Sequence, residues 1–181
     1  MKIIRSKRKT FALQIKPYEG LIVRVPLRAT KEQIEKFIDD NQVGIDKHLK
    51  AMEERQEKLA SVEKLTTDEI RALAEEALKV IPERVRHYAP LLGVTYGKIT
   101  IRNQRSRWGS CSARKNLNFN CLLMLMPPEV IDSVVVHELA HIKEMNHSER
   151  FYAEVLRVFP DYWKWQGWLK ENGQAVMARM K

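Results

Sequence analysis

The sequence has few cysteines and no long apolar run. Cys111 and Cys121 are the only cysteines among 181 residues, and no apolar stretch approaches 18 residues. Two lone cysteines ten positions apart match no metal-ligand spacing, so we expect thiols. About 18 apolar residues are the minimum for a transmembrane helix, so no membrane span is expected. The basic start lacks the apolar stretch of a secretory signal, which favours a cytoplasmic protein without a membrane partner.

Histidine is also scarce, but it is concentrated in one segment. The chain has five histidines, and three of them, His137, His141 and His147, lie within eleven residues. His137 and His141 are four positions apart, so on a helix both imidazoles leave one face and can bind one metal ion. Glu138 is placed to take a proton from a metal-bound water, the general base's role in a zinc hydrolase. Three protein ligands leave one position open, as in catalytic zinc sites.

The residues before this motif predict a helix. Pro127 and Pro128 are suited to a helix start, and Glu129 and Asp132 place negative charge near its N-terminus. An apolar stripe predicts that the helix is buried on one side; it consists of Val130, Ile131 and Val134. This context favours a metal site over the alternative, a pair of histidines in the core.

The third metal ligand has two alternatives. The gap from His141 to His147 equals that of the metzincin proteases, but Glu144 replaces their glycine, which puts a metzincin assignment in doubt. Glu154, on the next predicted helix, is the rival ligand, as in gluzincins. We favour His147, because an imidazole in a turn six residues after His141 reaches the metal easily.

The segment Arg105-Ser106-Arg107-Trp108-Gly109-Ser110-Cys111, an apolar strand and the histidine motif occur together. In this combination the chain resembles the YgjP-like metallopeptidase-domain family, which is related to the SprT-like and minigluzincin zinc proteases. The resemblance implies a zincin-like core with His137, His141 and His147 as ligands and Glu138 as catalytic base. It also implies a peptide or a nucleoside triphosphate as substrate.

Basic residues are concentrated in two segments. Residues 1–28 contain eight Lys or Arg and one acid, and residues 98–115 contain six Lys or Arg and no acid, while the whole chain carries +9. Such segments attract anions, so nucleic acid, nucleotide phosphate and acidic peptide are possible partners. The alternative is that these are strand edges kept charged against edge pairing. Arg105 and Arg107 are candidate substrate or anion contacts, because they precede Trp108 in the family motif.

The order of the predicted elements indicates an α+β fold. We expect an N-terminal appendage, residues 1–64, and a catalytic core, residues 65–181, with a small mixed sheet and a zinc-binding helix. In the appendage we expect strands at 3–4, 11–15 and 21–25, a turn at 18–20, and a helix at 31–59 that is capped by Thr30. The core is expected to begin with a helix from Thr66 to about Tyr88, with a kink or break at Pro82, followed by strands at 98–103 and 117–126. After the histidine motif we expect a left-handed Asn146 and then a helix that is capped by Ser148.

Several aromatic residues are candidates for roles near the metal. A peptide substrate is expected to lie along an edge strand, either 117–123 or 108–112. Trp108 is either a core anchor or part of the substrate-binding wall. The helical spacing of Trp163, Trp165 and Trp168 predicts core packing. Tyr152 and Tyr162 are candidate oxyanion donors.

The sequence therefore predicts a metal-dependent hydrolase that holds one Zn²⁺, with other divalent metals as alternatives. The first interpretation is a zinc metallopeptidase-type enzyme with Glu138 as general base. The second is a nucleoside-triphosphate pyrophosphatase, with UTP as the candidate substrate, on the same site. The third is an SprT-like protease that acts on nucleic-acid-bound proteins.

Overall fold

The computed structural model describes residues 1–16 and 20–180. The chain folds into two compact units, Met1–Ser61 and Val62–Lys181. Each unit has its own hydrophobic cluster. The first unit therefore ends at Ser61, three residues before the end of the appendage that the sequence predicts. No helix in the described residues is both long and apolar enough to cross a membrane.

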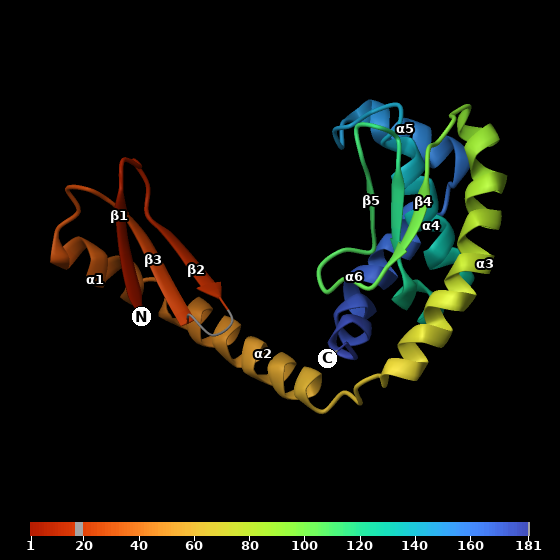
Figure 1. Ribbon diagram of the computed structural model, residues 1–181. Helices are drawn as coiled ribbons and strands as arrows, with labels where there is room; N and C mark the ends of the chain where they lie inside the picture. Colours follow the sequence, from red (N-terminus) through yellow and green to blue (C-terminus); the bar gives the residue numbers. More distant parts are fainter. Residues whose placement is uncertain (17–19, 181) are drawn as a thin grey trace. The chain divides into compact units, whose positions relative to one another are not determined.

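The first unit combines a three-stranded sheet with two helices (Figure 1). Its strands are β1 (Lys2–Ser6), β2 (Ala12–Lys16) and β3 (Gly20–Pro26), and its helices are α1 (Lys31–Asp39) and α2 (Gln42–Ala60). The central strand β3 pairs in parallel with β1 and antiparallel with β2. The expected turn at 18–20 falls largely on residues 17–19, which lie outside the described residues.

The prediction of one helix over residues 31–59 is wrong. The N-terminal cap is confirmed, because the Thr30 hydroxyl accepts from the Gln33 N–H and the Gln33 side chain accepts from the Thr30 N–H. The helix, however, ends at Asp39, and α2 begins at Gln42. Between them, the amide of Asn41 donates to the carbonyl of Phe37 at 2.8 Å. A side chain that binds a nearby carbonyl competes with the helical hydrogen bond, which helps to end the helix there.

The second unit places four helices around a second small sheet. The sheet has the order β4-β6-β5, with β6 parallel to β4 and antiparallel to β5. Its elements are α3 (Thr67–Leu92), β4 (Ile99–Arg102), β5 (Gly109–Cys111), β6 (Leu117–Asn120), the 3₁₀ helix η1 (Cys121–Leu125), α4 (Pro128–Ala140), α5 (Glu149–Val158) and α6 (Tyr162–Ala178). The α+β class is confirmed, as is a small mixed sheet beside the helix that carries the motif.

Two predicted element bounds in this unit are wrong. The strand expected over 117–126 ends at Asn120, whose side-chain oxygen accepts from the Leu122 N–H and starts η1. The helix that begins after Thr66 runs through Pro82 to Leu92 and ends at Gly93, which has the left-handed φ of +68°. The capping box of Thr66 and Glu69 is confirmed. Since β6 is the central strand, only β5 remains as the edge strand beside the motif.

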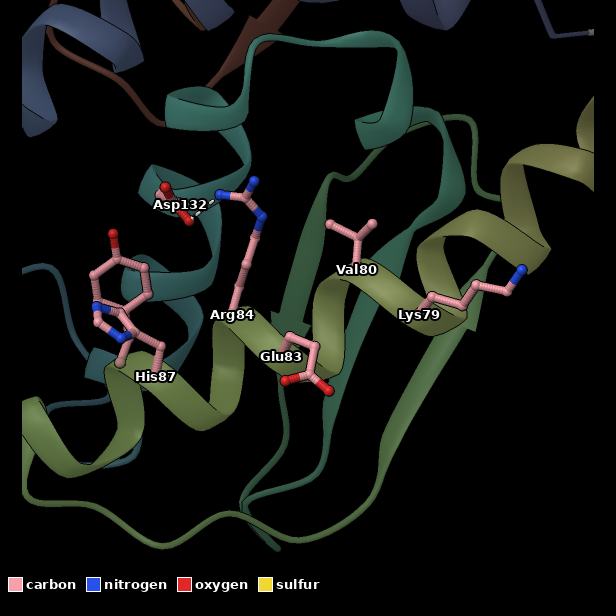
Figure 2. A pocket seen from close by; sticks show the side chains of 7 residues that line it. Lys79, Val80, Glu83, Arg84, His87 and Asp132 are labelled. Carbon is pink, nitrogen blue, oxygen red and sulfur yellow. Dashed lines mark hydrogen bonds and ion pairs between the residues drawn. The ribbon is translucent and has the colours of Figure 1, made fainter.

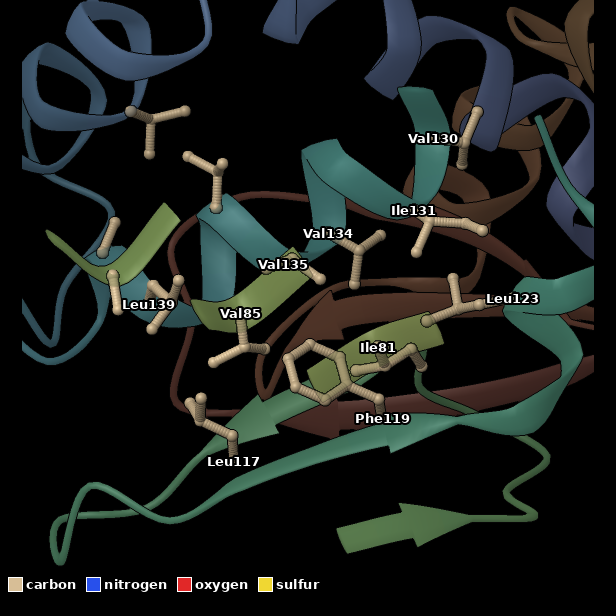
Figure 3. Close-up of a cluster of buried hydrophobic side chains, with 14 of the residues drawn as sticks. Ile81, Val85, Leu117, Phe119, Leu123, Val130, Ile131, Val134, Val135 and Leu139 are labelled. Atoms are coloured by element: carbon tan, nitrogen blue, oxygen red, sulfur yellow. The ribbon is translucent and has the colours of Figure 1, made fainter. Parts of the chain in front are cut away.

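A hydrophobic core holds α4 in place. Figure 3 shows side chains of α3, α4 and β6 that converge, among them Ile81, Val85, Phe119, Val135 and Leu139. All five are almost completely buried. Because interiors are close-packed, this core fixes the rotation of α4 and therefore the directions of its polar side chains.

Candidate metal centre

The three histidines lie on consecutive segments of the second unit: in α4, at its end, and before α5. His137 lies in the last turn of α4, and His141 is the residue that ends the helix. His147 lies in the turn before α5, whose N-terminus is capped by the Ser148 hydroxyl as expected. The predicted left-handed Asn146 is wrong, since Lys115 is the only non-glycine residue with positive φ in the described part of the chain.

The three imidazoles share one centre. Nε2 of His137 lies 3.2 Å from Nε2 of His141 and 3.1 Å from Nε2 of His147. One ligand nitrogen from each residue lies within 4.8 Å of the other two. At a Zn–N length of about 2.0–2.1 Å, neighbouring corners of a tetrahedron are about 3.3–3.4 Å apart. The spacing of the nitrogens therefore fits three ligands of one tetrahedral ion.

The second ring nitrogens of His137 and His141 have protein partners. Nδ1 of His137 lies 2.7 Å from the hydroxyl of Tyr162, and Nδ1 of His141 lies 3.2 Å from the carbonyl of Glu144. A carbonyl can only accept, so His141 carries its proton on Nδ1 and leaves the lone pair on Nε2. Such outer partners orient the ligating imidazoles of metal sites.

Burial favours the neutral forms of His137 and His141. Desolvation, assisted by the other two rings, lowers the pKa of His137 to about 3. Desolvation also lowers the pKa of His141. Imidazoles that are neutral near pH 7 have the lone pairs that a metal requires. The chemistry of this donor set fits a divalent metal such as zinc.

Glu138 lies beside the histidines and is almost completely buried, at 6% exposure. Burial raises the pKa of its carboxyl to about 8, against a smaller opposing effect of the Arg107 charge. The edge strand β5 passes very close to it: a Cβ built on Gly109 would lie 2.7 Å from Cγ and Oε1 of Glu138. Only glycine allows this approach, so Gly109 is part of the site.

The rival ligand Glu154 is not brought to the centre. Its carboxylate lies 2.9 Å from Lys143 Nζ and 2.8 Å from Arg157 Nη2. The described residues that cluster as possible metal ligands are the three histidines. The geometry therefore favours His147 over Glu154 as the third ligand.

A recess of about 240 Å³ opens beside Glu138 and His137. It is lined by Arg107, Trp108, Gly109, Val134, His137, Glu138, Gln166 and Leu169. Of the two candidate arginines, the structure thus brings Arg107 to the site, whereas Arg105 does not line the recess. Trp108 combines its two expected roles, because it packs against the core and also lines the recess.

Of the remaining aromatic candidates, Tyr152 lies near His147 and Trp163 lies next to Tyr152. The Tyr152 ring lies 6.2 Å from the His147 ring and 4.8 Å from that of Trp163. Core packing is confirmed for Trp165 and Trp168 but is wrong for Trp163, which is 55% exposed. The Trp163 ring packs against the rings of Tyr152 and Tyr162, while most of its own surface faces solvent.

A larger cavity of about 560 Å³ lies between α3 and α4 (Figure 2). In this cavity Arg84 of α3 points toward Asp132 of α4 and forms an ion pair with it. None of the three clustered histidines lines it. The ion pair connects the two helices at a distance from the motif.

Sequence reasoning missed three contributions to the site. Gln166 and Leu169 come from α6, and Gly109 contacts Glu138 from the edge strand. No local pattern marks the two α6 residues, because their role depends on how α6 packs against α4. Gly109 is part of the family motif, but nothing in the sequence indicates that it contacts Glu138.

Comparisons with known proteins give one family match and two similar solved structures. Residues 57–172 match the family described as YgjP-like, metallopeptidase domain. No curated protein matches the chain. Two crystal structures of metallopeptidase zymogens are similar to the chain, each at 22% sequence identity. For Pyrococcus abyssi abylysin the TM-score is 0.47, and the match covers 52% of this chain and 97% of abylysin. For Methanocaldococcus jannaschii jannalysin the TM-score is 0.46, and the match covers 51% of this chain and 95% of jannalysin.

A domain of this kind, with a histidine cluster that can hold a metal, is a metal-dependent hydrolase of metallopeptidase type. The family match spans well over half of the chain. The chain therefore belongs to the YgjP-like metallopeptidase-domain family.

Proposed function

We propose that the chain is a zinc metallopeptidase in which His137, His141 and His147 hold one Zn²⁺ and Glu138 is the general base. The observation that carries the proposal is the convergence of three imidazole nitrogens beside a buried carboxyl. Three nitrogen ligands leave a fourth position open for water or substrate, as catalytic zinc sites require.

The zinc would lower the pKa of a bound water and polarise the substrate carbonyl. The residues of the chain then have separate tasks. His137 and His141 are oriented through their Nδ1 atoms, so their Nε2 lone pairs are directed to the centre. A bound Zn²⁺ would favour the ionised form of the buried Glu138 carboxyl. Because Gly109 has no side chain, this carboxylate lies directly beside the strand and could accept the water proton and later donate it to the leaving amine.

The edge strand β5 gives a peptide a place to bind. It pairs with β6 on one side only, and it lies beside Glu138. A substrate strand added to this edge would form backbone hydrogen bonds and bring a scissile carbonyl to the site. Gly109 and Ser110 are small, which allows close approach of that backbone.

The experiment is an assay of the full, zinc-loaded chain on casein and on a mixed peptide library. We expect one zinc per chain by elemental analysis, together with peptide hydrolysis that Glu138→Gln lowers by roughly 10²–10⁴-fold while zinc remains bound. Peptide hydrolysis that is unchanged in Glu138→Gln would contradict the assignment of the base.

Nucleoside-triphosphate hydrolysis is the alternative on the same residues. One observation favours it: Arg107 lies at the recess beside Glu138 and could contact a phosphate. In this case UTP or another triphosphate should be hydrolysed by the zinc-loaded chain, and Arg107→Ala should raise its KM strongly. A lack of nucleotide hydrolysis in the wild type would exclude this alternative.

A role on nucleic-acid-bound proteins is the second alternative, and it also rests on charge. The strand pairing in the first unit places Lys2, Lys16 and Arg24 on one sheet face. Such a surface could bind a phosphate backbone inside the cell. Single-stranded DNA should then bind with steep salt dependence, and a combined change of these three residues to Gln should flatten it. Unchanged binding in that variant would contradict this role.

A further inference from the structure

The recess beside Glu138 has an apolar part and a charged part. Trp108, Val134 and Leu169 form its apolar wall, and the polar groups are those of Arg107 and Gln166 together with the catalytic pair His137 and Glu138. It opens directly at the residues that act on the scissile bond. A side chain next to that bond is therefore the part of a substrate that would enter it.

The wall of the recess is held in shape by close packing. Trp108 lies against α6, where a Cβ built on Gly173 would come within 3.2 Å of its ring. Val134 belongs to the buried face of α4. On the polar side, Nε2 of Gln166 donates to the Ser133 hydroxyl at 3.3 Å, and that hydroxyl donates to the carbonyl of Val130. The Gln166 amide is thus fixed and still has a second N–H to donate.

Arg107 is the only cation that lines the recess, and its side chain is exposed. Among the described residues, no carboxylate forms an ion pair with it. Its charge acts on Glu138, the single acid of the lining. A guanidinium in this position can form two parallel hydrogen bonds with a carboxylate, which adds orientation as well as binding energy.

We infer that this recess selects a substrate residue beside the scissile bond that carries a carboxylate on a short apolar stem, with Arg107 as the specificity-determining contact. The stem lies against Trp108 and Leu169, and the carboxylate reaches Arg107 and the free N–H of Gln166. A glutamate side chain has this form, and so does the free carboxylate of a peptide's C-terminal residue. The inference rests on the proposed peptidase function.

The first test maps the bonds that the zinc-loaded chain cleaves in a peptide library prepared from digested protein, by mass spectrometry of the new termini. The library is used with free and with amidated C-termini. We expect acidic residues to be enriched at one position next to the cut bond, and Arg107→Gln to abolish the enrichment while other bonds are still cleaved. Arg105→Gln is the matched control, because this nearby arginine does not line the recess, and it should keep the enrichment.

The outcomes separate the two carboxylate sources and the competing role of Arg107. Enrichment that survives amidation identifies a side-chain carboxylate, and enrichment that amidation removes identifies the peptide C-terminus. A uniform loss of cleavage in Arg107→Gln, with the preference unchanged, would overturn the inference and leave Arg107 as a residue that acts on Glu138 alone. Absence of any cleavage by the wild type would contradict the proposed peptidase function.

A binding measurement tests the recess without catalysis. The indole N–H signal of Trp108 is followed by NMR while N-acetyl-glutamate amide or N-acetyl-glutamine amide is added to the full chain. We expect the charged probe to shift this signal at roughly tenfold lower concentration, a difference that Arg107→Gln removes. The exposed Trp163 indole is the internal control and should not respond. Equal responses to both probes in the wild type would overturn the inference.

Discussion

The hydroxyl oxygen of Tyr162 lies 2.7 Å from Nδ1 of His137, although 25 positions separate the two residues. Tyr162 is almost completely buried in the first turn of α6, so the contact ties that helix to the motif helix α4. When His137 ligates through Nε2, its Nδ1 carries the proton and donates to the phenol oxygen. Tyr162 therefore orients the imidazole of His137, the first of the proposed ligands.

Tyr162→Phe keeps the ring and removes this acceptor. Loss of an outer partner of a metal ligand costs roughly 10–100-fold in metal affinity, and we expect a decrease of that size. Zinc affinity is measured by competition with a coloured chelator. Tyr152→Phe is the control, since Tyr152 contacts His147 only through ring packing, and its zinc affinity should stay at the wild-type value. Equal affinities of Tyr162→Phe and the wild type would contradict the orienting role.

His147→Ala and Glu154→Ala distinguish the two candidates for the third ligand. The loss of a direct ligand should weaken zinc binding by more than the roughly 100-fold upper range of an outer partner. Glu154→Ala removes ion pairs with Lys143 and Arg157 that are partly exposed, which contribute little to stability. The measurement is the same zinc competition, and the reverse order of effects would identify Glu154 as the ligand.

Gly109→Ala tests the close approach of the edge strand to Glu138. The added Cβ would lie 2.7 Å from the carboxyl, so the strand or the carboxyl must shift. We expect turnover to fall by roughly tenfold or more while zinc stays bound, because small displacements of a catalytic base are costly. Gly167→Ala in α6 has open space around its Cβ and should leave turnover unchanged while it raises the melting temperature slightly. Normal turnover in Gly109→Ala would contradict the argument.

The pH dependence of the metal-free chain should report the buried Glu138. Its pKa is about 8 in the folded chain, above the ordinary value of 4.5. Between these values Glu138 binds more proton in the folded chain than in the unfolded chain, so its contribution to the free energy of unfolding decreases as pH rises. Below pH 6.5 the histidines oppose this effect, so we expect the melting temperature of the wild type to fall between pH 6.5 and 8, and that of Glu138→Gln to fall less.

Glu154→Gln is the control for this titration. Ion pairing lowers the pKa of Glu154, so its contribution changes only below the ordinary range of a carboxyl. This variant should therefore keep the wild-type slope between pH 6.5 and 8. On the acid side, His137 has its pKa lowered to about 3, so both proteins should lose stability as pH falls below 6.5. Equal alkaline slopes in Glu138→Gln and the wild type would show that Glu138 does not titrate in this range.

The parts of the fold that depend on residues close together in the sequence could be predicted from it. The caps at Thr30, Thr66 and Ser148 are confirmed, because each depends on a hydroxyl and an N–H three residues later. The convergence of His137 and His141 likewise follows from helical spacing.

The features that depend on tertiary packing could not be predicted. The break at Asn41 and the end of β6 at Asn120 arise from side chains that bind nearby backbone groups in place of regular structure. The exposure of Trp163 depends on which face of α6 meets the core. The contact between Gly109 and Glu138 joins two segments whose approach no local pattern encodes.

We expect three imidazoles, and no other side chains, to hold the metal. X-ray absorption at the zinc K-edge of the zinc-loaded full chain tests it without knowledge of the substrate. We predict three imidazole nitrogens at about 2.0–2.1 Å and one oxygen ligand from water, with one imidazole lost in His147→Ala. A sulfur ligand from Cys111 or Cys121 would contradict the assignment of three imidazole ligands. An unchanged number of imidazoles in His147→Ala would contradict the assignment of His147.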